Sequence, residues 1–322
     1  MKNKIIMAVC CAASLFASCQ QEEIENGIEK LKVSIEATIG SAAGLPAGRY
    51  VGNEPNGVSF GADDEIGLSV DGGNFVKWTY NGSKWSPVGE SVYWENKTDE
   101  YRFCAFYPYK SLNGLSLLNV PMPDLSSQNG LMTDVAKHDF LVAEKEQAYG
   151  TDGVVSFTEE TGAPFEHVSS LIQIRIKGNG DLGLATIDSI LIEGTGITTL
   201  STYSFDSKEV ELDAVNASNK MLAKELNRQM NSNDQLFYFI LNAGTVNLAD
   251  MSLTIGYTSG EKKYKAKLQG MGSGSTKLER GKLYSYTLKI SDGVLTISGN
   301  EIKDWESGEN MDDIVINGEE QA

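Results

Sequence analysis

The chain has little of what catalytic and metal sites are usually built from. Its 322 residues include only two histidines, His138 and His167, and neither has a cysteine or second histidine at ligand spacing. The sequence also lacks a nucleophile elbow, a metalloprotease helix and a calcium-loop motif. We therefore expect no catalytic residue, no metal ion and no cofactor, and we expect both histidines to be structural.

Cysteine is almost absent beyond the N-terminus. Cys104 is the only one after residue 19, so the folded part cannot form an internal disulfide. It lies in the apolar run YRFCAFY at residues 101–107, which predicts a buried, unreactive thiol.

Positive charge is also scarce. Lys and Arg number 27 against 44 Asp and Glu, which gives a net charge of −17. Nucleic acid is excluded as a partner, because neutralising phosphates needs a basic surface. Helical apolar periodicity is rare, whereas Thr, Ser, Val, Ile and Tyr are plentiful, so we expect an all-β fold. The length predicts about two domains.

The first 18 residues have the layout of a secretory signal peptide. Two lysines precede a short apolar run at residues 5–16, which is too short for a permanent membrane helix. The run ends in LFASC, which resembles the lipobox of bacterial lipoproteins, although Phe16 stands where that pattern prefers Leu. The resemblance implies removal of residues 1–18 and attachment of diacylglycerol and a further acyl chain, such as palmitate, at Cys19. The alternative is an ordinary signal peptide with a chance cysteine.

Residues 19–30 are expected to form an acidic tether. The stretch QQEEIE at residues 20–25 resembles the export signal that sends Bacteroidetes lipoproteins to the cell surface. The alternative is a solvated linker. The first interpretation predicts a protein that is lipid-anchored in the outer membrane and exposed on the cell surface.

Residues 31–39, LKVSIEATI, form the most regular stretch of the chain. Leu31, Val33, Ile35, Ala37 and Ile39 alternate with polar residues throughout. Successive side chains of a strand point to opposite faces, so this pattern predicts a half-buried β-strand.

A small-residue loop, residues 40–49, follows this strand and ends at Arg49. Its Gly, Ala, Ser and Pro content is typical of exposed segments that proteases cut. Arg49 is the first arginine, so a trypsin-like protease cutting there would release the strand together with its lipid. The alternative is an ordinary loop with a stray arginine.

Several short motifs occur in a fixed order along the rest of the chain. They are ADDEIG at 62–67, a Trp-bearing hairpin with an Asn81-Gly82 turn, Tyr93-Trp94, AFYPY at 105–109, DFLVA at 139–143 and a Phe-x-His step opening a long alternating strand at 165–176. This order resembles the fimbrillin, or Mfa-like, family of pilin-like Bacteroidetes lipoproteins. Phe60 stands where the family more often has tryptophan. The resemblance implies two tandem transthyretin-like Greek-key β-sandwiches, at residues 31–162 and 163–322.

The resemblance also implies a fimbrial subunit or tip adhesin. A sandwich without one edge strand has an apolar groove and unpaired backbone groups, and a strand from another subunit can fill it. If residues 31–39 occupy this groove until proteolysis, removing them permits head-to-tail assembly into a filament. The expected donor is the tail, at Ile314, Val315 and Ile316. Partners would be other pilin subunits, the outer membrane and a host or bacterial surface ligand.

The alternative function is a permanently anchored surface lipoprotein that binds glycans or host ligands. Its binding face would consist of aromatic side chains in the first half, namely Trp78, Tyr80, Trp85, Tyr93, Trp94 and Tyr109.

Three local features complete the expectations. A shared apolar stripe predicts one helix at residues 218–230. The Gly-rich residues 270–277 are expected to form a hairpin loop, because a phosphate loop would need a following helix. Ser189 matches a three-residue acceptor pattern for O-glycosylation that also occurs by chance.

Overall fold

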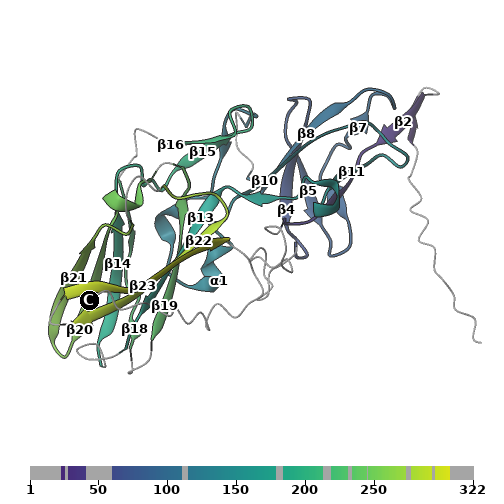
Figure 1. Ribbon diagram of the computed structural model, residues 1–322. Coiled ribbons are helices and arrows are strands. Elements are labelled where there is room, and N and C mark those ends of the chain that lie inside the picture. Colours follow the sequence, from purple (N-terminus) through teal and green to yellow (C-terminus); the bar gives the residue numbers. More distant parts are fainter. Residues whose placement is uncertain are drawn as a thin grey trace, which may run out of the picture.

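Strands form almost all of the regular structure in the computed structural model (Figure 1). It describes residues 23–25, 28–40, 60–110, 115–178, 184–212, 219–230, 234–244, 246–272, 277–291 and 294–304. The all-β prediction is confirmed, and the strands form β-sandwich layers. Within these ranges no helix has both the length and the apolar character needed to cross a membrane.

The described residues of the first half form twelve strands and three short helices. They are β1 (Glu23–Glu25), β2 (Ile28–Lys32), β3 (Ser34–Ala37), β4 (Glu65–Val70), β5 (Val76–Tyr80), β6 (Trp85–Pro87), β7 (Tyr93–Trp94), β8 (Tyr101–Tyr107), β9 (Val120–Pro121), β10 (Leu141–Gln147), β11 (Val154–Phe157) and β12 (Glu166–His167), with η1 (Leu125–Ser127), α1 (Met132–Val135) and η2 (Glu159–Thr161).

A six-stranded sheet in the order β12-β10-β8-β4-β5-β6 is the main layer of the first half. Its β5–β6 turn is the predicted one: the Asn81 side-chain oxygen accepts hydrogen bonds from two backbone N–H groups, and Gly82 has a φ of 89°. β3, β11 and the β2–β7 pair cover one face of this sheet and enclose an aromatic-rich core with it.

In the second half, the part of the chain that the structure describes contains eleven strands. They are β13 (Ser169–Ile176), β14 (Thr186–Glu193), β15 (Ser201–Ser204), β16 (Glu209–Leu212), β17 (Lys220–Ala223), β18 (Arg228–Gln229), β19 (Gln235–Asn242), β20 (Ser252–Ser259), β21 (Lys262–Gln269), β22 (Lys282–Ser291) and β23 (Val294–Asp304), with the short helix η4 (Leu248–Asp250).

Two facing sheets enclose the core of the second half. One has the order β19-β13-β22-β23, and the other has the order β17-β14-β20-β21 with β18 also paired to β14. The β13–β22 pair is parallel and the other pairs of these two sheets are antiparallel. The core between them is mainly aliphatic, because both sheets turn alternate Ile, Leu, Val and Met side chains inward.

The predicted helix at residues 218–230 is wrong, since the described part of this stretch contains β17 and β18. Met221 and Ala223 are buried and Leu222 between them is half-buried, which is the two-residue period of a strand. Glu225 and Asn227 have positive φ values of 57° and 48°, which are incompatible with an α-helix. The hairpin expected at residues 270–277 is also wrong, because β21 and β22 belong to different sheets.

The β15–β16 hairpin was not predicted, and it lies against the first half (Figure 1). β15 pairs with β9, in the register Thr202–Pro121 and Tyr203–Val120. Its aromatic residues pack with Phe106 and Phe140 on the second face of the six-stranded sheet. A segment of the second half therefore completes a core of the first.

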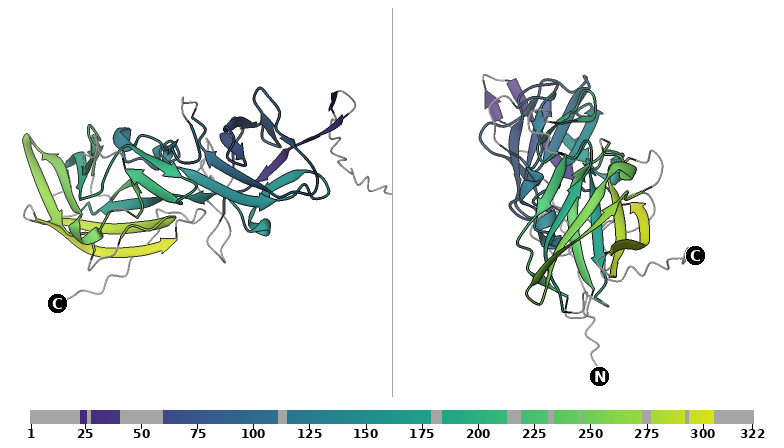
Figure 2. Two further views of the ribbon diagram at one scale, coloured as in Figure 1. Left: turned by 90° about the horizontal axis from the view of Figure 1, so that it is seen from above. Right: turned by 90° about the vertical axis from the view of Figure 1, so that its left-hand side faces the viewer.

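Segments of the first half, in turn, pack on a sheet of the second half. Leu125 of η1 and Val135 of α1 pack on Leu171, Ile240 and Leu283, which lie on the outer face of β19, β13 and β22. The described residues of the two halves (Figure 2) therefore pack on each other through two sets of contacts, one from each half. A division of the chain at residue 162 stays a prediction.

Candidate functional site

The predicted strand at residues 31–39 consists of two pieces: the end of β2, which lies between β1 and β7, and β3, which pairs with β11 alone among the described strands. β2 pairs antiparallel with β7, in the register Leu31–Trp94 and Lys32–Tyr93. β3 then pairs parallel with β11, from Ser34–Val154 to Ala37–Phe157. Val33 lies between the two pieces, so the strand predicted as continuous changes partner there.

Backbone hydrogen bonds hold this segment along its whole length. The Val33 N–H donates to Val92 O at 2.9 Å, and the Ser34 N–H donates to Gly153 O at 3.2 Å. The Trp94 indole Nε1 also donates to Gly153 O, at 3.1 Å. The Gly153 carbonyl therefore accepts from both Trp94 of β7 and Ser34 of β3, at the point where the segment changes its pairing partner from β7 to β11. Further along, the Thr38 N–H donates to Phe157 O at 2.9 Å.

The segment ends at Gly40, where two backbones approach closely. Phe165 N donates to Thr38 O and Gly40 N donates to Phe165 O, both at 2.9 Å. A Cβ atom on Gly40 would lie 2.5 Å from Pro164 Cγ. Only glycine fits here, because the proline ring opposite has no freedom to move aside.

The side chains alternate between core and solvent as the sequence predicts. Val33, Ile35 and Ile39 are 2%, 6% and 2% exposed, whereas Glu36 and Thr38 are exposed. Leu31 and Ala37 are half-buried against the same core. The buried residues meet an aromatic cluster in which Phe60 has edge-on contacts with Trp85, Tyr107 and Phe165, at centroid distances of 5.1, 5.7 and 5.2 Å.

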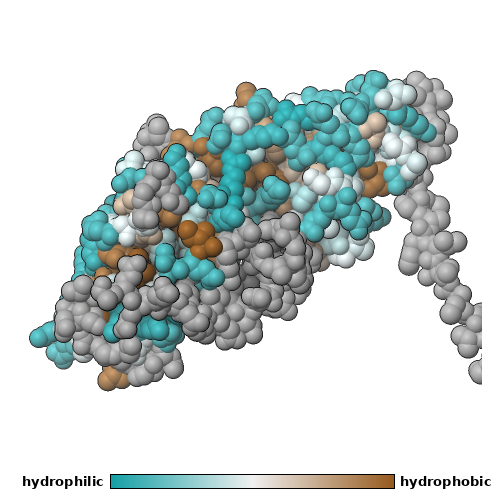
Figure 3. Space-filling view, in the orientation of Figure 1, coloured by the Kyte–Doolittle hydropathy of each residue, from teal (hydrophilic) through white to brown (hydrophobic). Residues whose placement is uncertain are grey.

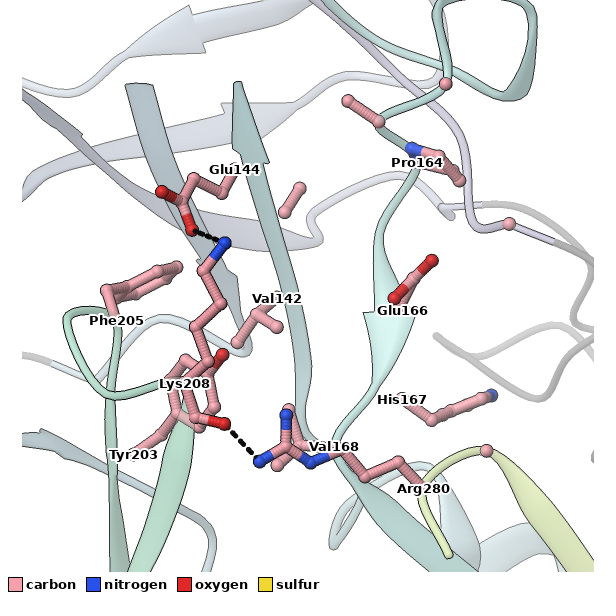
Figure 4. Close-up of a pocket in the computed structure, with 15 residues that line it drawn as sticks. Val142, Glu144, Pro164, Glu166, His167, Val168, Tyr203, Phe205, Lys208 and Arg280 are labelled. Atoms are coloured by element: carbon pink, nitrogen blue, oxygen red, sulfur yellow. Dashed lines mark hydrogen bonds and ion pairs between the residues drawn. The ribbon is translucent and has the colours of Figure 1, made fainter. Parts of the chain in front are cut away.

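A hollow of about 440 Å³ lies beside the end of this strand, where the two halves meet (Figure 4). Gly40 and Pro164 line one side, and Tyr203 and Lys208, from the hairpin region, line the other. The loss of residues up to Gly40 would therefore remove part of its wall.

Three of the charged side chains that line the hollow, Glu144, Lys208 and Arg280, already have partners. Lys208 Nζ lies 3.1 Å from Glu144 Oε2, as Figure 4 shows. The Arg280 guanidinium lies 5.6 Å from the centre of the Tyr203 ring and donates a hydrogen bond to Lys208 O. Glu144 also accepts from Arg102 Nε at 2.9 Å. These pairs connect the hairpin to β8 and β10, and we assign them a structural role.

The two histidines occupy structural positions. His167 Nδ1 lies 2.7 Å from Asp139 Oδ2, and both side chains are fully buried. His138 Nδ1 lies 2.9 Å from Asp124 O and its Nε2 lies 3.3 Å from Asp134 Oδ2. No group of three or more His, Cys, Asp or Glu side chains among the described residues is arranged to hold a metal ion.

Cys104 is buried, as predicted. Burial raises the pKa of its thiol to about 12, and the nearby Glu144 and Asp206 carboxylates act in the same direction while Arg102 lowers it. The thiol is therefore protonated and unreactive in the folded protein.

The other sequence-predicted sites are spread over different parts of the chain. Cys19, Arg49, Ile314, Val315 and Ile316 lie outside the described residues. Ser189 is half-buried on β14, and its hydroxyl lies over Gly256, where a Cβ would be only 2.4 Å away. Its glycosylation stays a prediction.

The predicted aromatic binding face is largely absent from the described surface. Trp78, Trp85 and Trp94 are all buried in the core of the first half, where Trp94 packs edge-on to Phe103 and Tyr149. Figure 3 shows a mainly hydrophilic face, on which hydrophobic patches are small and separate. The tryptophans therefore stabilise the sandwich and are not available for stacking on sugars.

The sequence analysis missed the residues by which the hairpin joins the two halves. Tyr203 on β15 and Phe205 directly after it, and Val210 and Leu212 on β16, alternate with polar residues on either side of the turn at residues 205–208. This period-two pattern was the available signal for a hairpin. Nothing local in it indicates that its apolar face covers the other half.

Comparison with solved structures identifies the same fold in two proteins. A candidate cell adhesion protein of Bacteroides uniformis aligns over 86% of this chain and 99% of its own, with 20% identity and a TM-score of 0.57. One of Bacteroides ovatus aligns over 87% and 98%, with 16% identity and a TM-score of 0.54. Comparison with curated proteins gives no match.

The sequence profile of the fimbrillin-like family matches residues 52–305. This region contains the described strands from β4 to β23. The chain therefore belongs to the fimbrillin-like family.

Proposed function

We propose that the protein is a fimbrial subunit or tip adhesin that assembles by strand exchange after its first strand is removed. Family membership supports a pilus or adhesion role at the cell surface. The two similar structures are also described as candidates for cell adhesion. The proposal adds to this role a specific assembly step at the first strand.

One observation carries the proposal: residues 33–39 fill a core, but their strand β3 lies at an edge. Val33, Ile35 and Ile39 belong to the aromatic-rich core of the first half. Among the described residues β3 pairs with β11 alone, and the segment ends beside the junction at Gly40. An edge strand of this kind can leave without breaking the ladder of the six-stranded sheet.

The energy of this burial explains why the groove would need a new occupant. Each of the three buried aliphatic side chains contributes about 1.5–3 kcal/mol, so together they contribute roughly 5–9 kcal/mol. This is comparable with the whole free energy of unfolding of a typical domain, about 5–15 kcal/mol. A subunit with an empty groove is therefore strongly driven to accept a strand of similar pattern from another subunit.

The remaining parts of the proposal concern residues outside the described ranges. Cys19 would carry the lipid that anchors the precursor to the outer membrane, and Arg49 would be the site of proteolysis. Ile314, Val315 and Ile316 would supply the donated strand. A filament forms because this contact is head-to-tail and does not close on itself.

The proposal is tested by exposing the purified protein to an arginine-specific protease. We expect a product that begins at Tyr50 and assembles into filaments seen by electron microscopy, whereas Arg49→Ala stays intact and monomeric. Lys32→Ala is the matched control, because it removes a basic residue that an arginine-specific enzyme does not cut. Filaments of the Arg49→Ala variant would remove Arg49 from the mechanism.

The permanently anchored lipoprotein is the competing function, and the N-terminus of the protein on cells distinguishes it. Mature protein that begins at Cys19, with no form beginning at Tyr50 on cells, would favour the anchored protein. The burial of the three tryptophans gives no support to its proposed aromatic binding face.

A further inference from the structure

Pro164 blocks one end of the groove that residues 33–40 occupy. A Cβ atom on Gly40 would lie 2.5 Å from Pro164 Cγ and 2.9 Å from Pro164 Cβ. Gly40 does not have a positive φ, so its backbone conformation is open to other residues and only the lack of space demands a glycine. No side-chain rotation relieves such a contact, because the proline ring is joined to the backbone at both of its ends.

Pro164 is held in place from both sides. Before it, the Ala163 N–H donates to Thr158 O at 3.2 Å, which closes the turn. After it, Phe165 is fully buried and packs edge-on against Phe157, at a centroid distance of 5.7 Å. Pro164 therefore cannot withdraw from position 40 without disturbing the core of the first half.

The backbone groups around residues 33–40 also determine how a replacement strand must run. The N–H groups at positions 33, 34, 38 and 40 donate to four carbonyl oxygens, those of Val92, Gly153, Phe157 and Phe165. The occupying strand is parallel to β11. Parallel and antiparallel ladders space their hydrogen bonds differently, so a strand that reaches all four oxygens runs in the same direction as residues 33–40. A strand that ends before position 40 leaves the last of these oxygens unpaired.

Alternation alone leaves the register of such a strand ambiguous. A shift by one residue turns the apolar side chains outward, but a shift by two returns them to the same face. The glycine removes this ambiguity, because every other residue would bring a Cβ atom against Pro164.

We propose that the groove selects a strand of another subunit by a glycine, which must lie opposite Pro164 directly after the last buried side chain. The apolar side chains of that strand take the places of Val33, Ile35 and Ile39, which are buried here. This inference rests on the proposed strand exchange. It adds the rule by which the partner strand and its register are chosen.

The test is a competition between two peptides for the emptied groove. A cleavage site for a sequence-specific viral protease is inserted after Arg49 in a chain that begins at Gln20, and the released piece is removed in urea. The remainder is refolded with equal amounts of a peptide of residues 31–40 and of its Gly40→Ala variant. Native mass spectrometry should show about tenfold more of the glycine peptide bound, or a larger excess.

The matched control is the same peptide with Glu36→Ala, which changes an exposed side chain and should bind within about twofold of the unaltered peptide. In the protein, Pro164→Gly removes both ring atoms that the added Cβ would meet. It should reduce the preference for glycine to less than about twofold, which separates a steric cause from a change in the peptide itself.

The outcomes distinguish this rule from the strand exchange on which it rests. Equal binding of the glycine and alanine peptides overturns the glycine rule and leaves strand exchange in place. A preference that persists in Pro164→Gly also overturns the rule. If no peptide binds, strand exchange itself is overturned, and the rule with it.

Discussion

Ile35 lies at the centre of the first strand and is buried against the aromatic core, whereas its neighbour Glu36 is exposed. We expect Ile35→Ala to lower the free energy of unfolding by about 2–4 kcal/mol, because it removes buried methylene groups and leaves a cavity. Glu36→Ala should change it by less than about 0.5 kcal/mol. Urea unfolding followed by tryptophan fluorescence measures both, and equal effects would show that the strand is not docked as described.

Cys104 offers a second test at the scale of one residue. Burial raises the pKa of its thiol to about 12, so at pH 8 almost none of the reactive thiolate is present. A protein expressed from Gln20 onward contains this cysteine alone and should resist a thiol-specific reagent until it is denatured in urea. Rapid modification of the native protein would show that β8 is exposed.

For single residues, the sequence predicted burial best where a strand buries one of its two faces. The alternation from Leu31 to Ile39 predicted which side chains enter the core, because a strand has a period of two. The roles of the tryptophans could not be predicted in the same way. Trp85 and Trp94 lie on strands of three and two residues, which are too short to show an alternation.

At the scale of elements, the hairpin β15–β16 is the least predictable part of the fold. Its alternation indicates two strands. However, β9, with which it pairs, and β8, whose side chains share its core, precede it by many residues. Contacts between distant segments depend on the packing of the whole chain, which a local pattern does not contain. The same reason explains the wrong helix at β17, where pairing with β14 decided the conformation.

The hairpin's importance to the first half can be tested at Phe205, which is 1% exposed. Phe205→Ala should lower the free energy of unfolding by about 3–5 kcal/mol. It should also accelerate amide hydrogen exchange in β8 and β10, because its ring packs in the core with Phe106 and Phe140.

Ser207→Ala, in the exposed turn of the same hairpin, should leave that exchange unchanged. Faster exchange confined to the second half in Phe205→Ala would show that the hairpin stabilises only its own sandwich.

For the molecule as a whole, the two crossing contacts predict that the halves unfold together. The hairpin completes a core of the first half, and η1 and α1 cover the outer sheet face of the second. Differential scanning calorimetry should therefore give one transition, with equal calorimetric and van't Hoff enthalpies. Two resolved transitions would show that each half is stable alone, as a simple tandem arrangement implies.

The parallel pair at the centre of the second half also determines when that half can fold. β13 ends at Ile176, but its parallel neighbour β22 begins only at Lys282. Pairing of such distant strands is slow, because a long loop must first be closed. On the ribosome, β13 therefore cannot pair with β22 until nearly the whole polypeptide has been made. The four-stranded sheet of the second half is thus completed only at the end of translation, because β22 also carries the last strand, β23.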